Sequence, residues 1–290
     1  MPELPEVESI KLQLKKFIVG HKILNIEIRY GKKFEGEKGK VEGAKIQDVR
    51  RFAKALVIDL SNSYSIVIHV KLTGQLIYEG PNLKKGHQLS KKVIGGLGGK
   101  HTHIIFHLDK GGKLYFNDVR KFGWMKVIQK SKLKNQTEFI GKLGPEPLIN
   151  ANDPPENPLT LDKFREILSK SSQAIKIVLM DQEKISGVGN IYANDALWLA
   201  GIKPVRKAKD LREDEVKKLF KSIIDVLKEG IKRGGASELA FVTPDGSEGK
   251  YQDFTLVYGR EGESCKNCKT AIRKIKIGGR GTYFCPNCQS

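Results

Sequence analysis

The spacing of apolar residues predicts a helix at the start of the chain. Within residues 5–19, four apolar residues recur at steps of three and four: Val7, Ile10, Leu14 and Phe17. This period places them on one face of a helix. Pro5 suits the first helical turn, and Gly20 offers a C-terminal stop.

From about residue 22 to residue 128 the period changes to two, which is typical of strands. Apolar residues alternate with polar ones at 24–29, and a hairpin is predicted to turn at residues 109–112. In the segment 64–72 the same alternation places His69 and Lys71 on one strand face, opposite Ile68 and Val70. We expect that face to point outwards. Residues 80–100 are rich in glycine and lysine and predict a mobile basic loop.

The second half of the chain reads as helices followed by short strands. Residues 149–158 have the composition of a linker. Thr160 can cap a helix over 161–170, a second helix covers about 172–181, and Asn190 can cap a third that Gly201 stops. Asp210 and Glu213 resemble a capping box for a long helix to about residue 233. Short strands are expected from residue 254 onwards.

Composition favours a folded protein that binds a polyanion. The chain has 290 residues, 39% of them hydrophobic, and no apolar run long enough for a transmembrane helix. The N-terminus has no signal-peptide pattern, so a cytoplasmic location is expected. The formal charge of +19 attracts anions. Solubility alone could explain that charge, and an anionic membrane is a weaker candidate because no basic amphipathic anchor is visible. Nucleic acid is the favoured partner.

All four cysteines lie near the C-terminus as two C-x2-C pairs: Cys265, Cys268, Cys285 and Cys288. Two such pairs on tight turns can present four thiolates tetrahedrally to a zinc ion. Disulfides are the alternative, and a cytoplasmic chain disfavours them. Four thiolates leave no open position for substrate, so we expect one structural zinc ion rather than a catalytic one.

The opening sequence MPELPEVES suggests a nucleophile at the chain start. If Met1 is removed, Pro2 carries a free secondary amine, which can attack an aldehyde carbon and form a positively charged iminium ion. The positive end of the following helix disfavours the protonated amine. Glu3 could then act as a general acid or base. Glu6 lies in the first turn, where it could simply cap the helix. Pro2 alone is weak evidence, and it gains weight only with the other features.

Eight segments together resemble the formamidopyrimidine-DNA glycosylase family: PELPEVES, HVKLTGQL, KHTHIIF, NDVRKFG, LGPEPL, ISGVGNIYANDALW, VYGREGESC and GRGTYFCPNCQ. The resemblance spans essentially the whole chain. It implies an α+β multidomain fold: a β-sandwich with an N-terminal helix in residues 1–130, a linker at 131–158, a helix–two-turn–helix domain at 159–253 and a β-hairpin zinc finger at 254–290. It implies excision of oxidised purines from duplex DNA, followed by β,δ-elimination at the abasic site.

The resemblance also implies roles for single residues. Pro2 would attack C1′, Glu3 would protonate the opening sugar, and Lys54 and Arg280 would assist elimination, with Glu6 a further catalytic candidate. An apolar side chain, an arginine and a phenylalanine would fill the gap left by the extruded base: Leu72, Arg120 and Phe122. The remaining expected DNA contacts are His69, Lys71, His101, Lys176 and Asn190, of which Asn190 lies at a glycine-rich turn suited to phosphate.

The sequence departs from the family pattern in three places. Residue 72 is leucine where methionine is common, and the loop at 80–100 is longer than usual. The lesion-capping region, residues 234–252, has Leu239 and Ala240 where many members carry Arg-Asp, which leaves lesion preference open. Three alternatives remain: an endonuclease VIII-like specificity for oxidised pyrimidines, which Leu4 disfavours, a non-catalytic binder of damaged DNA, and a structural zinc-ribbon protein. We expect a monomer with damaged double-stranded DNA as its partner, no obligate protein partner and no membrane.

Overall fold

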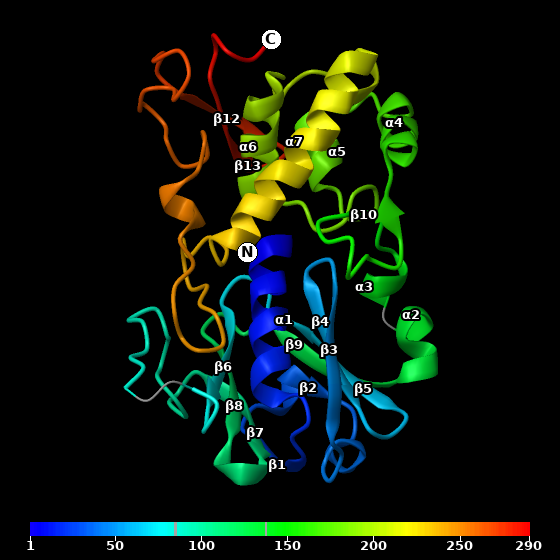
Figure 1. The fold of residues 1–290 in the computed structure, drawn as a ribbon, viewed down its shortest axis with the longest axis vertical. Coiled ribbons are helices and arrows are strands. Elements are labelled where there is room, and N and C mark those ends of the chain that lie inside the picture. The colour runs from blue at the N-terminus through cyan, green and yellow to red at the C-terminus, as the bar shows by residue number, and fades with distance from the viewer. Residues whose placement is uncertain (84–85, 137) are drawn as a thin grey trace. The chain divides into compact units, whose positions relative to one another are not determined.

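The computed structural model describes residues 1–83, 86–136 and 138–290, and it divides into two compact units (Figure 1). Unit 1 comprises Met1–Gly141 and Arg233–Gln252, and unit 2 comprises Lys142–Lys232 and Asp253–Ser290. Among the described residues, no helix is long and apolar enough to cross a membrane.

Unit 1 contains the predicted N-terminal helix and two sheets. The long helix is α1 (Leu4–Ile18), and the short α2 (Leu133–Gln136) and α3 (Glu138–Gly141) follow the sheets. One sheet has the order β1-β7-β8-β6 and the other the order β2-β9-β5-β4-β3. The strands are β1 (Ile23–Ile28), β2 (Phe34–Glu35), β3 (Ile46–Phe52), β4 (Ala55–Leu60), β5 (Tyr64–His69), β6 (Gly74–Glu79), β7 (Thr102–Leu108), β8 (Lys113–Asp118) and β9 (Trp124–Gln129).

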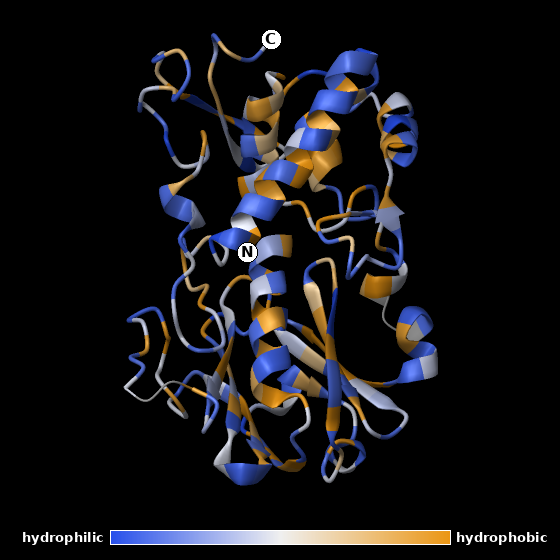
Figure 2. Ribbon diagram, in the orientation of Figure 1, coloured by the Kyte–Doolittle hydropathy of each residue, from blue (hydrophilic) through white to orange (hydrophobic). Residues whose placement is uncertain are grey.

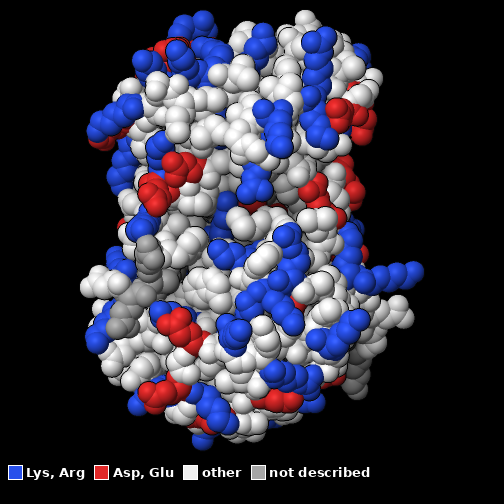
Figure 3. Space-filling view, turned by 180° about the vertical axis from the view of Figure 1, so that it is seen from behind, with Lys and Arg blue, Asp and Glu red and all other residues white. Residues whose placement is uncertain are grey.

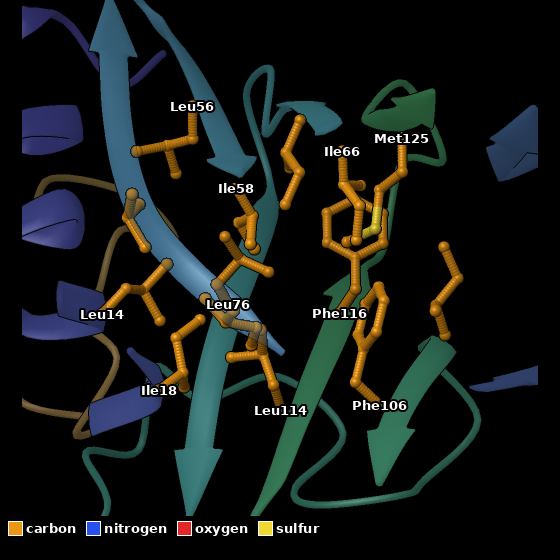
Figure 4. Packing of buried hydrophobic residues seen from close by; sticks show 14 of the residues in the cluster. Leu14, Ile18, Leu56, Ile58, Ile66, Leu76, Phe106, Leu114, Phe116 and Met125 are labelled. Carbon is orange, nitrogen blue, oxygen red and sulfur yellow. The ribbon is translucent and has the colours of Figure 1, made fainter. Parts of the chain in front are cut away.

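One apolar core joins the helix to both sheets, which confirms the predicted sandwich. Leu14 and Ile18 of α1 pack with Leu56 and Ile58 of β4 and with residues of β5 to β9, among them Ile66, Leu76, Phe106, Phe116 and Met125 (Figure 4). Burying side chains of this size contributes about 1.5–3 kcal/mol each. The hairpin predicted at residues 109–112 is present between β7 and β8.

The alternating pattern was wrong about two side chains. Leu24 is 56% exposed, because the pairing of β1 with β7 shifts between Ile23 and Asn25. His69 is only 2% exposed, so the strand face predicted to carry His69 and Lys71 does not point into solvent at His69. The reason is that β5 is covered on both sides: Ile66 and Ile68 enter the main core, and Val67 joins a second apolar cluster.

Unit 2 is mainly helical and ends in a two-stranded hairpin. Its helices are α4 (Leu161–Ser169), α5 (Ile175–Met180), α6 (Asn190–Ala200) and α7 (Glu213–Lys232). Strands β10 (Glu146–Pro147) and β11 (Pro158–Leu159) pair in parallel around the linker, and β12 (Arg273–Ile277) and β13 (Arg280–Phe284) form the hairpin. Hydrophobic and hydrophilic residues alternate along the turns of α7, as an amphipathic helix requires (Figure 2).

Of the four helix caps predicted in unit 2, two are right and two are displaced. Thr160 Oγ1 accepts from Lys163 N, and Gly201 ends α6 in the left-handed conformation. Asn190 is the first helical residue, with Gly189 as the N-cap. Helix α7 begins at Glu213 rather than after Asp210, because a separate 3-10 turn occupies 208–210. At this start the Glu215 side chain accepts from Arg212 N.

The capping segment, residues 234–252, packs with unit 1 rather than with the helical unit to which the sequence assigned it. Phe241 belongs to the main core of the sandwich, and Tyr78 N donates to Pro244 O over 2.7 Å. These contacts join residues that are far apart in the chain, so local patterns gave no sign of them. The other predicted domain limits stay predictions.

Candidate functional site

The N-terminus of α1 brings three of the predicted residues together. Glu3 is the N-cap and forms a capping box with Glu6, whose Oε2 accepts from Glu3 N over 2.7 Å. The other carboxylate oxygen of Glu6 accepts from Ala236 N over 2.8 Å. Pro2, Glu3 and Glu6 are all buried. Glu6 therefore caps the helix and also fixes the capping segment beside it.

Lys54 lies close to this helix start. It sits in the turn between β3 and β4, after Ala53, which has a left-handed φ of 51°, and its side chain is buried. The pKa of the Met1 amine lies below its ordinary value, mainly because the amine is buried. The charges of Glu3 and Glu6 raise this pKa, and the charge of Lys54 lowers it further. The amine end of the chain, two carboxylates and one lysine thus share a single desolvated region of unit 1.

A buried ion network supports the Lys54 turn. Arg51 donates through Nε to Glu8 Oε2 over 2.6 Å and through a terminal nitrogen to Ala53 O over 3.2 Å. Lys11 lies 2.6 Å from the other oxygen of Glu8. All three charged side chains are almost fully buried. The network ties α1 to the turn that carries Lys54.

Arg51→Met should destabilise unit 1 by about 3 kcal/mol, because it leaves a buried carboxylate without its main partner. Urea unfolding can measure this in a Trp198→Phe background, where Trp124 is the remaining tryptophan of the two in the chain and lies in unit 1. The matched control is Lys15→Met, since the Lys15–Asp48 pair is more than one-third exposed and should cost less than about 1 kcal/mol. Equal losses in the two variants would contradict this role.

The three residues predicted to fill a gap in DNA lie on two loops that are bonded to each other. Leu72 is partly exposed, Arg120 is exposed, and the Phe122 ring is 55% exposed with the Arg120 guanidinium 4.9 Å from its centre. Arg120 N donates to Thr73 Oγ1, and Gly123 N donates to the buried Asp118. Phe122 is therefore not a core residue.

His69 and Lys71 are held in one local geometry. Lys71 N donates to His69 Nδ1 over 3.0 Å, and Lys71 has a left-handed φ of 52°. Burial, followed by the charges of Lys71 and Lys54, lowers the pKa of His69 to about 3. The imidazole is therefore neutral near pH 7, and its proton resides on Nε2, which remains a donor. His101, at the start of the β7 region, is half-buried.

Lys176 is not available for the predicted DNA contact. Its side chain is fully buried, and Nζ donates to Gly281 O over 2.9 Å and to Thr282 Oγ1 over 2.7 Å. These acceptors belong to the β12–β13 hairpin, so Lys176 binds the hairpin instead. Asn190, by contrast, is partly exposed at the start of α6, after a turn in which Gly187 has a φ of 88°.

The four cysteines are positioned to bind a metal ion. Their sulfur atoms all lie within 4.8 Å of one another. The Cys265–Cys288 and Cys268–Cys285 sulfur distances are 3.8 and 3.4 Å. A tetrahedral site with metal–sulfur bonds of about 2.3 Å requires sulfur atoms about 3.8 Å apart. The donor set and its spacing therefore fit zinc.

Two adjacent polar residues of α6 anchor the finger, and the sequence analysis missed both. Asp195 accepts from three backbone N–H groups, those of Leu256, Val257 and Tyr258, over 3.0–3.1 Å. Asn194 Oδ1 accepts from Tyr283 N over 2.8 Å. The signal was their presence together in the otherwise apolar run of α6. Arg280 itself is exposed at the hairpin turn, which two left-handed glycines form.

Basic side chains are widespread on the molecular surface. Figure 3 shows many Lys and Arg residues, with fewer Asp and Glu, on the face turned away from the viewer in Figure 1. This distribution agrees with the formal charge of +19 and with an anionic partner.

Three family models match the chain. The N-terminal domain of formamidopyrimidine-DNA glycosylase matches residues 1–125, the H2TH domain of the same enzyme matches 143–241, and a zinc finger found in FPG and IleRS matches 262–290. A formamidopyrimidine-DNA glycosylase of Listeria monocytogenes is 38% identical over 294 residues, covering all of both chains. One of Rickettsia africae is 39% identical, covering 100% of this chain and 99% of the other.

Solved structures of one such enzyme are similar to this chain over nearly its whole length. Lactococcus lactis Fpg bound to DNA with an abasic site has a TM-score of 0.83 and 35% identity, covering 99% of each chain. The same enzyme with DNA containing an oxidised pyrimidine has a TM-score of 0.83 and 36% identity over the whole of both chains.

Proposed function

Because the chain belongs to the formamidopyrimidine-DNA glycosylase family, and is thus a base-excision repair glycosylase and abasic-site lyase that binds damaged DNA, we propose that it removes 8-oxoguanine and formamidopyrimidines from duplex DNA and cuts the strand by β,δ-elimination. The observation that carries the proposal is the desolvated start of α1, where Pro2, Glu3, Glu6 and Lys54 meet.

Pro2 is the proposed nucleophile, after removal of Met1. Its amine forms a bond to C1′ of the damaged nucleoside as the bond to the base breaks and the base leaves with a proton. The C1′–O4′ bond then opens to give an iminium ion, while Glu3 gives its proton to O4′. The burial and the Lys54 charge that lower the pKa of the Met1 amine would act on the Pro2 amine as well, and would keep it neutral and reactive.

Elimination follows from the same iminium ion. It withdraws electrons from C2′, so that loss of a C2′ proton expels the 3′-phosphate, and a second elimination expels the 5′-phosphate. Lys54 is a proposed proton donor near the sugar, and Arg280 a proposed phosphate ligand during the second step. Glu6 supports Glu3 by bonding its backbone N–H, and is a further catalytic candidate.

Extrusion of the base needs groups that fill the gap and hold the backbone. The residues proposed to fill the gap are Leu72, Arg120 and Phe122. Their two loops are joined by a hydrogen bond, and all three side chains are at least partly exposed. Extrusion costs a few kcal/mol, which these contacts would offset. The proposed backbone ligands are Lys71, His101 and Asn190. The buried His69 would instead orient Lys71, from whose backbone N–H it accepts a hydrogen bond. A bound zinc ion would hold the finger that presents Arg280.

Incision of duplexes that each contain one lesion tests the proposal. Cleavage at 8-oxoguanine opposite cytosine should leave phosphate on both strand ends. The main alternative is preference for oxidised pyrimidines, since a similar structure holds such DNA. Cleavage of that duplex alone would support the alternative. Binding without cleavage of any damaged duplex would indicate a non-catalytic binder.

DNA binding should weaken steeply with salt. Each phosphate that a cationic side chain neutralises releases counterions. Contacts from at least three such side chains imply that the logarithm of the binding constant falls with the logarithm of the salt concentration, with a slope of about −3 or steeper. Fluorescence anisotropy between low and moderate salt, with an uncleavable abasic analogue, measures the slope. A slope near zero would contradict the electrostatic account of binding.

A further inference from the structure

Residues 86–94, named the strap here, lie along the capping segment. Ser90 N donates to Gly246 O over 2.9 Å, and Ser90 Oγ donates to Glu248. The Lys92 ammonium lies 2.7 Å from the other carboxylate oxygen of Glu248. Leu89 packs against Gly246, where φ is +80° and an added Cβ would lie 2.4 Å from the Leu89 side chain. Backbone, charge and packing thus all join the two segments.

The buried side chain of Gln75 in β6 forms hydrogen bonds with both the strap and the capping segment. Gln75 is 1% exposed, and its Nε2 donates to both Lys92 O and Ala240 O. Its Oε1 accepts from Ile94 N over 3.1 Å. Val93 of the strap packs with Val242 of the capping segment in a small apolar cluster. Gln75 therefore uses both ends of its amide to hold the two segments in one register.

Lys92 of the strap and Gln75 of β6 each fix one end of a short exposed turn. Lys92 Nζ donates to Ser237 O, and Gln75 Nε2 donates to Ala240 O. The two residues between these carbonyls, Glu238 and Leu239, are exposed, and Leu239 is 62% exposed. The residue before Ser237 donates its N–H to Glu6. The turn therefore begins two residues after Ala236, whose N–H binds the carboxylate that orients Glu3.

We propose that Lys92 and Gln75 are positioning residues that fix the Glu238–Leu239 turn against the extruded base, so that the strap determines which bases are excised. The inference rests on the proposed function and adds a determinant of specificity to it. A mobile turn would lose the fixed geometry on which rate and selectivity depend, because a displacement of about 1 Å in a positioning group can cost up to about a hundredfold in rate. An abasic site has no base to meet the turn.

The test compares two activities of one variant. Lys92→Met keeps the side-chain stem but removes the bond to Ser237 O and the charge beside Glu248. We expect kcat for excision of 8-oxoguanine to fall about tenfold, while cleavage of a duplex with a preformed abasic site stays within twofold. Lys92→Arg should recover most of the excision rate. Lys91→Met removes the same charge from the exposed neighbouring position and serves as the matched control.

Glu248→Gln provides a second variant, because it weakens the hold on Lys92 without touching the turn. Excision should again fall more than abasic-site cleavage. Equal losses in both activities, or equal effects of Lys91→Met and Lys92→Met, would overturn the strap proposal. If the wild-type protein excises no damaged base at all, the proposed function fails instead, so the two failures are distinguishable.

Discussion

Replacing Pro2 by glycine should lower 8-oxoguanine excision at least a hundredfold. A secondary amine gives an iminium ion that has no N–H proton to lose, so its positive charge persists at neutral pH. The primary amine of glycine gives an imine that is neutral unless it is protonated. The neutral imine is a weaker electron sink than the iminium ion. Glycine also removes a buried ring and frees the backbone beside Glu3. Single-turnover excision with excess enzyme measures the chemical step directly.

Pro5→Ala is the matched control for this loss. Pro5 lies in the first turn of α1, three residues after Pro2, and is also buried. Alanine suits a helix, so this variant should excise at close to the wild-type rate. Comparable losses in the two variants would show that Pro2 supports the structure of the helix start, and would refute its role as the nucleophile.

Removal of the metal from the four-cysteine site should lower DNA affinity at least tenfold. Structural zinc contributes apparent binding free energies of about 10–16 kcal/mol in small fingers, so the finger should unfold without it. Arg280 would then lose the hairpin that presents it. Chelation followed by anisotropy on abasic-analogue DNA measures the loss, and Trp198, which packs on the cysteine cluster, reports unfolding by its fluorescence.

Cys268→Ser should reproduce the effect of the chelator, whereas Ser264→Ala, next to Cys265, should bind metal and DNA normally. Added zinc should restore the chelated wild-type protein but not Cys268→Ser. Unchanged affinity after metal analysis has verified the loss of the ion would refute the structural role of the site in DNA binding.

Local sequence patterns predicted the features that depend on near neighbours. The helix from Leu4 to Ile18, the Thr160 cap, the hairpin after β7 and the cysteine pairs each arise from residues a few positions apart. The fold class and the family followed from motifs spread along the whole chain, and both are confirmed by the matches.

Features that depend on distant contacts could not be predicted in this way. His69 is buried because apolar residues cover both faces of β5, and Lys176 is buried because it binds a hairpin more than 100 positions away. Glu6 reaches Ala236 across 230 positions of sequence. A charged or polar side chain has the same local pattern whether it meets solvent or a distant carbonyl, so tertiary packing decides between them.

Borohydride trapping on a duplex with 8-oxoguanine opposite cytosine, followed by mass spectrometry, shows whether Pro2 is the nucleophile. We expect a reduced covalent adduct at Pro2, in a chain that lacks Met1. Trapping only on an oxidised-pyrimidine duplex would reassign the substrate while keeping the nucleophile. An adduct at a lysine instead, or no adduct even on an abasic-site duplex, would contradict catalysis by Pro2.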